Sequence, residues 1–110
     1  MPDIPRAAAV RGTTMRWTWT EGPTKGKVHE HVFHQDGTVE YGSASGERPP
    51  YAAFEVTPEV CAVSYLAPSG FTLTVVLNFA THEMVGIASS KDQWHPVRGT
   101  FEVDESARAR

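Results

Sequence analysis

Apolar and polar residues alternate along most of this chain at the two-residue period of a β-strand. Near the start, Met15, Trp17 and Trp19 share one face, and polar side chains occupy the positions between them. Further on, the Asp36-Gly37 pair separates two alternating stretches, which is a strong signal of a tight β-hairpin. The pattern therefore predicts strands at residues 13–19, 27–34, 38–43, 52–56, 59–66, 71–79, 84–89 and 97–103.

Short turns rich in glycine and proline separate these segments, and only residues 7–11 could form a helical turn. About eight short strands in succession are typical of an antiparallel meander that closes into a barrel. We therefore expect an all-β, calycin- or lipocalin-like fold. Its predicted parts are a flexible N-terminal arm over residues 1–12, one β-barrel over 13–103 and a polar C-terminal tail over 104–110.

The inner face of the predicted barrel is rich in aromatic rings. A barrel of about eight strands is just wide enough to be filled by side chains or to hold one small ligand. A ring-lined interior with few polar atoms is typical of a site for a flat or apolar molecule, and a solid aromatic core is the alternative. The residues expected inside are Trp17, Trp19, Phe33, Tyr41, Phe54, Tyr65, Phe71, Leu73, Val75, Leu77, Phe79 and Phe101.

Composition excludes several classes of partner. The chain has 110 residues, a formal charge of -3 and ten scattered Lys and Arg residues, so nucleic acid is not expected. A single cysteine, Cys61, rules out an internal disulfide and indicates a buried thiol. No run of about 18 apolar residues predicts a membrane span, and residues 1–12 lack the apolar core of a signal peptide. We therefore expect a cytoplasmic location and no membrane partner.

Five histidines raise the question of a metal site. His29 and His31 share one face of a strand and could bind one metal together, but Glu30 lies on the other face, and His82 and His95 fall in turns. We therefore expect no metal and no other cofactor. Because the two histidines alternate in phase with Phe33, they are predicted to face the barrel interior, where a neutral imidazole can act as donor, acceptor or general base.

Residues 15–41 and 60–86 also carry an ordered set of short motifs. These are the aromatic pair of the first strand, a Gly-Pro turn, a Phe-x-x-Asp-Gly-x-Val hairpin, and a Ser-Tyr-x-x-Pro-x-Gly turn that leads into Leu-Asn-Phe. In these motifs the chain resembles the small calycin barrels grouped as MoaF-like, and more distantly the phenolic acid decarboxylases. The resemblance implies a metal-free barrel that holds a small molecule.

The comparison with the decarboxylases implies a pocket without their chemistry. Trp17 and Trp19 stand where that family has two substrate-holding tyrosines, and Ala67 stands where it has a proton-donating glutamate. Arg48 falls on the loop that carries the family's arginine, where it could pair with a ligand carboxylate. Because proton transfer needs a positioned acid or base, the resemblance implies the fold and the pocket rather than decarboxylation.

Three functions are open from the sequence. The first is a barrel that binds a small apolar or aromatic molecule, and the second is a cofactor-free lyase or isomerase on a small aromatic or carboxylate substrate, with His29 or His31 as acid or base. The third is a filled barrel that serves as an interaction module, with a homodimer through 71–79, a run that is apolar on both faces in its middle. The residues predicted to bind a ligand are Trp17, Trp19, Phe33, Tyr41, Arg48 and Tyr65.

Overall fold

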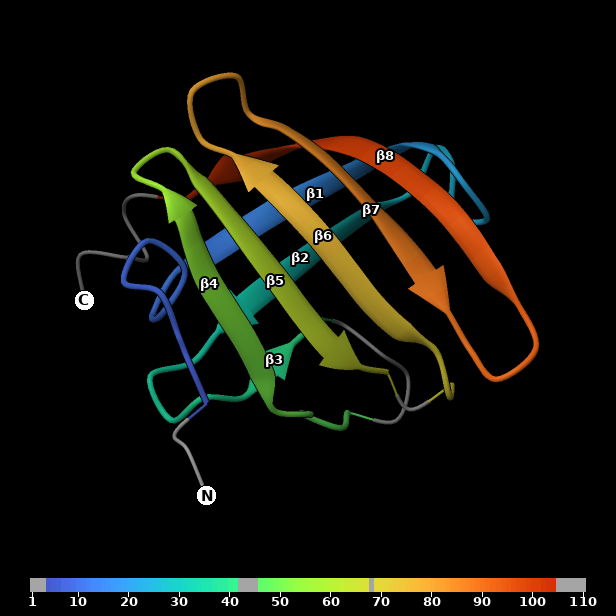
Figure 1. Ribbon diagram of the computed structural model, residues 1–110, viewed down its shortest axis with the longest axis horizontal. Coiled ribbons are helices and arrows are strands. Elements are labelled where there is room, and N and C mark those ends of the chain that lie inside the picture. The colour runs from blue at the N-terminus through green and yellow to red at the C-terminus, as the bar shows by residue number, and fades with distance from the viewer. Residues whose placement is uncertain (1–3, 42–45, 68, 105–110) are drawn as a thin grey trace.

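The computed structural model describes residues 4–41, 46–67 and 69–104, and over these residues the chain forms eight strands and no helix (Figure 1). The predicted all-β class is therefore confirmed. The strands are β1 (Thr14–Glu21), β2 (Val28–Phe33), β3 (Val39–Glu40), β4 (Tyr51–Thr57), β5 (Val60–Leu66), β6 (Thr72–Asn78), β7 (Glu83–Ser89) and β8 (Trp94–Val103).

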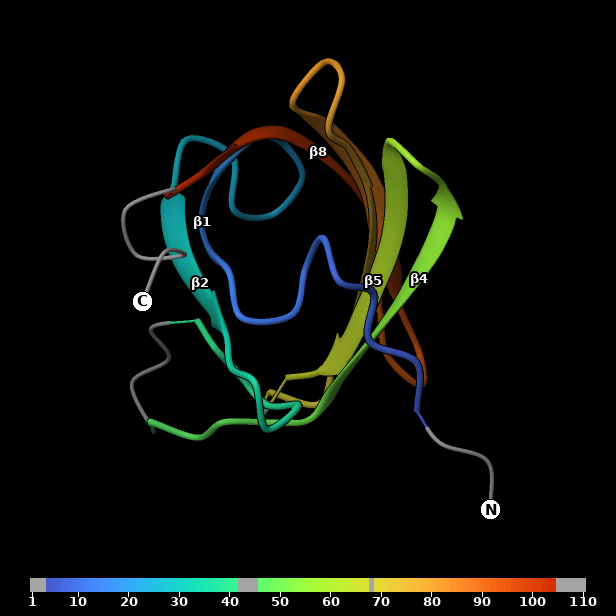
Figure 2. The ribbon, with the colours of Figure 1, turned by 90° about the vertical axis from the view of Figure 1, so that its left-hand side faces the viewer.

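The strands form one antiparallel sheet that curls into a barrel. Its strand order is β3-β2-β1-β8-β7-β6-β5-β4, so strands that follow one another in the chain pair, except β3 and β4 at the two ends of the order, and β8 returns to pair with β1. The register places Trp17 between His29 on β2 and Phe101 on β8. Viewed from one end, the strands form a ring (Figure 2), which confirms the predicted meander barrel.

The ring is closed between β3 and β4 by a short seam. Val39 N donates to Pro49 O at 2.8 Å, and Tyr51 N donates to Gly37 O at 3.1 Å. Strand β3 is shorter than the predicted strand over 38–43: it ends at Glu40, and residues 42–45 lie outside the described residues. Pro49 and Pro50 contribute to the short pairing, because proline has no N–H to donate to a ladder.

The segment before β1 closes one end of the barrel. Ala53 N donates to Pro5 O and Ala7 N donates to Ala53 O, both at 2.9 Å, while Val10 is fully buried. In Figure 2 this blue segment crosses the end of the ring. The sequence predicted a flexible arm for residues 1–12, but the described residues 4–12 hydrogen-bond to β4 and bury an apolar side chain, so this part is not a free arm.

The predicted inner face is largely confirmed. Met15, Trp17 and Trp19 are buried on β1, and the Cys61 thiol is buried as expected. Phe54 was predicted to lie inside but is 58% exposed. Tyr51 and Ala53 occupy the inner phase of β4, and because side chains alternate between the two faces, Phe54 must point outward.

The outer face of the barrel is apolar over several strands. Val76, Val85 and Ile87 are exposed there, and β5 and β6 contain no charged residue. Val75 is buried and Val76 is exposed, so within one chain the 71–79 segment is covered on its inner face only. The homodimer through this segment stays a prediction. The described part of the chain contains no helix that would reach across a membrane.

We predict that Gly86→Ala lowers the free energy of unfolding by about 2 kcal/mol or more. A Cβ at Gly86 would lie 2.0 Å from the backbone oxygen of Thr74 on the neighbouring strand, so the two strands would have to separate. Urea denaturation measures the loss, and Ser89→Ala on the same strand should change the stability by no more than about 0.5 kcal/mol. Equal stability of the two variants would contradict this close strand approach.

Candidate functional site

A cavity of about 260 Å³ occupies the end of the barrel opposite the N-terminal segment. That segment precedes the start of β1, whereas the cavity reaches Pro23 and Thr24, which follow the end of β1. The lining is mostly apolar and aromatic. It consists of Trp19, Pro23, Thr24, His29, Tyr41, Tyr65, Ala67, Ser69, Phe71, Leu73, Ala88, His95 and Val97.

Four of the residues predicted to form the site line this cavity, namely Trp19, His29, Tyr41 and Tyr65. The strand register explains this for Trp19, His29 and Tyr65, which occupy inner positions toward the same end of the barrel. Tyr41 follows the end of β3, and its ring packs on Tyr65 with 5.2 Å between ring centroids. Trp17 and Phe33 were also predicted as ligand contacts. Both are fully buried and neither lines the cavity, so they belong to the packed part of the barrel.

His31 lies in that packed part, among aromatic rings. Its side chain is 1% exposed, and its ring stacks on Trp17 with 3.8 Å between ring centroids. Its Nε2 lies 2.9 Å from the Tyr65 hydroxyl oxygen, which joins β2 to β5 across the interior. The predicted inward direction of His31 is therefore correct, but the residue supports the cavity wall instead of lining it.

The imidazole of His31 is neutral at physiological pH. Burial lowers its pKa to about 3, because a charged ring would be cut off from water. Nδ1 lies 3.4 Å from the His29 carbonyl oxygen, which can only accept a hydrogen bond. This favours the tautomer with the proton on Nδ1, so the Tyr65 hydroxyl donates to Nε2. Burial also raises the pKa of Tyr65 above its usual range, which keeps its hydroxyl protonated.

His29 is held by the second indole of β1. Trp19 Nε1 donates to His29 Nδ1 over 2.9 Å, so in the neutral ring the proton lies on Nε2. Partial burial, together with the nearby charge of Lys27, lowers the pKa of His29 and favours this neutral form. His29 therefore brings a ring with one N–H donor to the wall of the cavity, and the same ring also borders an outer groove over Val28 and Tyr41.

The two histidines do not form a metal centre in this arrangement. Their ring centroids are 6.5 Å apart, and both nitrogens of His31 face other partners. Among the described residues, no three His, Cys, Asp or Glu side chains are grouped so that they could bind a metal ion.

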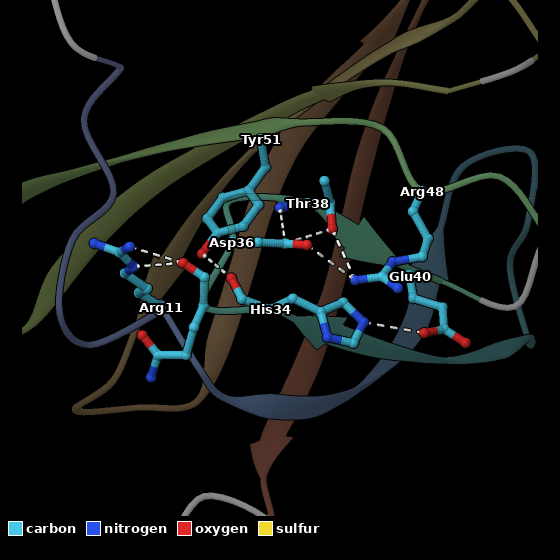
Figure 3. Close-up of polar contacts among 8 residues, drawn as sticks. Arg11, His34, Asp36, Thr38, Glu40, Arg48 and Tyr51 are labelled. Carbon is cyan, nitrogen blue, oxygen red and sulfur yellow. Dashed lines mark hydrogen bonds and ion pairs between the residues drawn. The ribbon is translucent and has the colours of Figure 1, made fainter.

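Arg48 does not reach the cavity. Its Nη2 lies 3.3 Å from Asp36 Oδ2 and 3.1 Å from Thr38 Oγ1, on the β2–β3 hairpin (Figure 3). Thr38 also donates to Asp36 from its backbone N and its hydroxyl. In the structure Arg48 thus fastens the segment before β4 to the hairpin beside the seam, and it is not available to a ligand inside the barrel.

Sequence reasoning missed His95 as a lining residue, because it assigned that histidine to a turn. In the structure β8 begins at Trp94, and His95 lies six residues before Phe101 on the same face of the strand. The phase of the strand could have revealed this, since residues an even number apart share a face. Phe71 and Leu73, which also line the cavity, were expected inside the barrel.

No model of a known protein family matches the chain, and no curated protein matches it. Among solved structures, the barrel is similar to a crystal structure described as "a putative beta-lactamase" from Burkholderia vietnamiensis. The two chains share 14% identity with a TM-score of 0.67, over 90% of this chain and 99% of the other. At this identity the similarity shows a shared fold.

We predict that His31 makes the protein less stable in acid. Its folded-state pKa of about 3 lies below the ordinary value of 6.5, so between these pH values the unfolded chain binds more protons. The stabilisation is complete above pH 6.5 and is lost as pH falls, by up to about 1.4 kcal/mol per pH unit from this one group.

Urea denaturation of the native protein and His31→Gln at pH 7, 6 and 5 measures this effect. As pH falls, the free energy of unfolding should decrease more steeply for the native protein than for the variant, because only the native protein contains His31. All other titratable residues are common to both proteins and contribute equally. Parallel pH dependence of the two proteins would show that His31 is not held neutral.

Proposed function

We propose that this protein binds a small apolar or aromatic organic molecule in the cavity at the open end of the barrel. The observation that carries the proposal is the lining: Trp19, Tyr41, Tyr65 and Phe71 surround a space of about 260 Å³. Small-molecule sites are commonly concave, apolar and aromatic, with a few placed polar groups. His29 supplies such a group here.

We also propose that the protein belongs with the MoaF-like barrels that its sequence motifs resemble. An eight-stranded meander barrel with a cavity at one end is the architecture that a MoaF-like, lipocalin-like binding protein requires. The structural neighbour is described as a beta-lactamase, but the residues of this chain do not support lactam hydrolysis. Ser69 lines the cavity, but residue 72 is Thr instead of the Lys of a Ser-x-x-Lys motif.

The three tryptophans allow a direct test of ligand binding. Trp19 lines the cavity, Trp17 is fully buried outside the lining, and Trp94 is 67% exposed on the outer face of β8. Titration with a panel of small aromatic compounds should change the tryptophan fluorescence in a saturable way. Trp19→Phe should remove most of this change, because the phenyl ring keeps the cavity wall but not the indole.

Trp94→Phe is the matched control and should keep the full ligand-dependent change. If none of a broad panel changes the fluorescence, or if Trp94→Phe removes the response instead, the cavity is not the binding site.

Catalysis on the bound molecule is a second candidate function. His29 brings an imidazole to the cavity wall, and its Nε2 can accept a proton only in the other tautomer, in which Nδ1 carries the proton and Trp19 no longer donates to it. A cofactor-free lyase or isomerase should convert a compound that the fluorescence titration identifies. His29→Gln should then lower kcat by about 100-fold or more while the compound still binds.

Product formation, followed by chromatography, separates these two functions. Equal turnover by His29→Gln and the native protein would exclude His29 as the acid or base. Binding without any product supports a binding protein alone.

A further inference from the structure

We propose that the ligand of this cavity is uncharged, and that its one polar group accepts a hydrogen bond from His29. This inference rests on the proposed binding function and narrows the ligand to a class. The resemblance to the decarboxylases would instead suggest a carboxylate ligand, so the two can be distinguished by experiment.

The lining of the cavity offers no lysine or arginine to a carboxylate. None of the residues that line the cavity is Lys, Arg, Asp or Glu. The arginine that the sequence suggested for a carboxylate is paired with Asp36 outside the barrel. Burying an ionised carboxylate without a charged partner removes its hydration with no compensating charge, so an anion is strongly disfavoured inside.

Nearby segments do not supply the missing charge. Residues 42–45 have the sequence Gly-Ser-Ala-Ser and residue 68 is proline, so the loops that flank the lining residues Tyr41, Ala67 and Ser69 add no charged side chain at these positions. Lys25 and Lys27 follow the lining residue Thr24, and Lys27 is close enough to His29 to lower its pKa, but both lysines are exposed and neither lines the cavity. An ammonium group in water gives little help to a buried anion.

The hydrogen-bonding groups of the lining favour a neutral acceptor on the ligand. The Trp19 indole occupies His29 Nδ1, which leaves the Nε2 proton, and among the described residues the ring makes no second hydrogen bond. The Tyr65 hydroxyl is committed to His31, and His95 Nε2 lies 3.1 Å from Gln93 Oε1. Thr24 and Ser69 add hydroxyl groups to the lining, which carry no charge. A ligand that carries a carbonyl, ether or aromatic nitrogen can accept from His29 without bringing a charge into the cavity.

The volume of the cavity limits the size of the ligand. At about 260 Å³ the cavity lies just below the usual range for drug-sized ligands, which is about 300–1,000 Å³. The rings of Trp19, Tyr41, Tyr65 and Phe71 provide flat walls. A single aromatic ring with a short neutral substituent fits these dimensions.

Three probes of similar shape test the inference: benzamide, benzoate and toluene. Each is titrated into ¹⁵N-labelled protein at pH 7.5, and the chemical shifts of the cavity residues give Kd. Benzamide should bind at least about tenfold more tightly than benzoate, because only benzoate brings a full charge. It should also bind more tightly than toluene, because only benzamide can accept from His29.

Two substitutions at His29 test the hydrogen bond. His29→Gln keeps an N–H donor, so it should keep the preference for benzamide over toluene. His29→Leu removes the donor and should abolish that preference while toluene still binds. A preference that survives in His29→Leu would overturn the role of His29.

A substitution that adds a positive charge to the lining tests whether the missing charge is what disfavours an anion. Ala67→Lys places an ammonium group on the lining, next to a turn, and should raise the affinity for benzoate at least about tenfold relative to benzamide. Benzoate binding as tightly as benzamide to the native protein would overturn the inference, although the proposed binding function would stand. If no probe binds, the proposed binding function fails together with the inference.

Discussion

The stacking of His31 on Trp17, joined to the hydrogen bond from Tyr65, is the interaction on which the interior of this barrel depends. A histidine with a 1% exposed side chain is stable only if both of its nitrogens find partners and its ring stays neutral. The His29 carbonyl and the Tyr65 hydroxyl supply those partners. Because the three strands β1, β2 and β5 all contribute, the contact fixes the width of the barrel at this level.

This contact also separates the filled part of the barrel from the hollow part. On one side, Phe33 and Tyr51 pack with 5.0 Å between their ring centroids, and Val10 of the N-terminal segment is buried. On the other side, Trp19, His29 and Tyr65 form walls with open space between them. The sequence left a filled and a hollow barrel as alternatives, and the structure combines both, with one end packed and the other open.

The fold could be predicted from sequence because strand phase is a local property. Alternation in β1 and β2 correctly placed Trp17, Trp19 and His31 inside, and the Asp36-Gly37 pair located the hairpin. Phe54 failed because its strand offers two apolar phases, and only pairing with β5 decides between them. Arg48 could not be placed, since its ion pair with Asp36 depends on how the β3–β4 seam closes. The cavity exists because some inward-facing rings do not pack against one another. The alternation pattern of a single strand cannot predict this, since the rings come from several strands.

The most direct measurement of the central claim is a crystal structure of the protein soaked with 4-bromotoluene, in which bromine is located by its anomalous scattering. A ring-lined hollow predicts a bromine peak inside the barrel, within van der Waals contact of Trp19, Tyr65 and Phe71. A bromine peak only on the outer apolar face, with side chains filling the space beside Trp19, would contradict the claim.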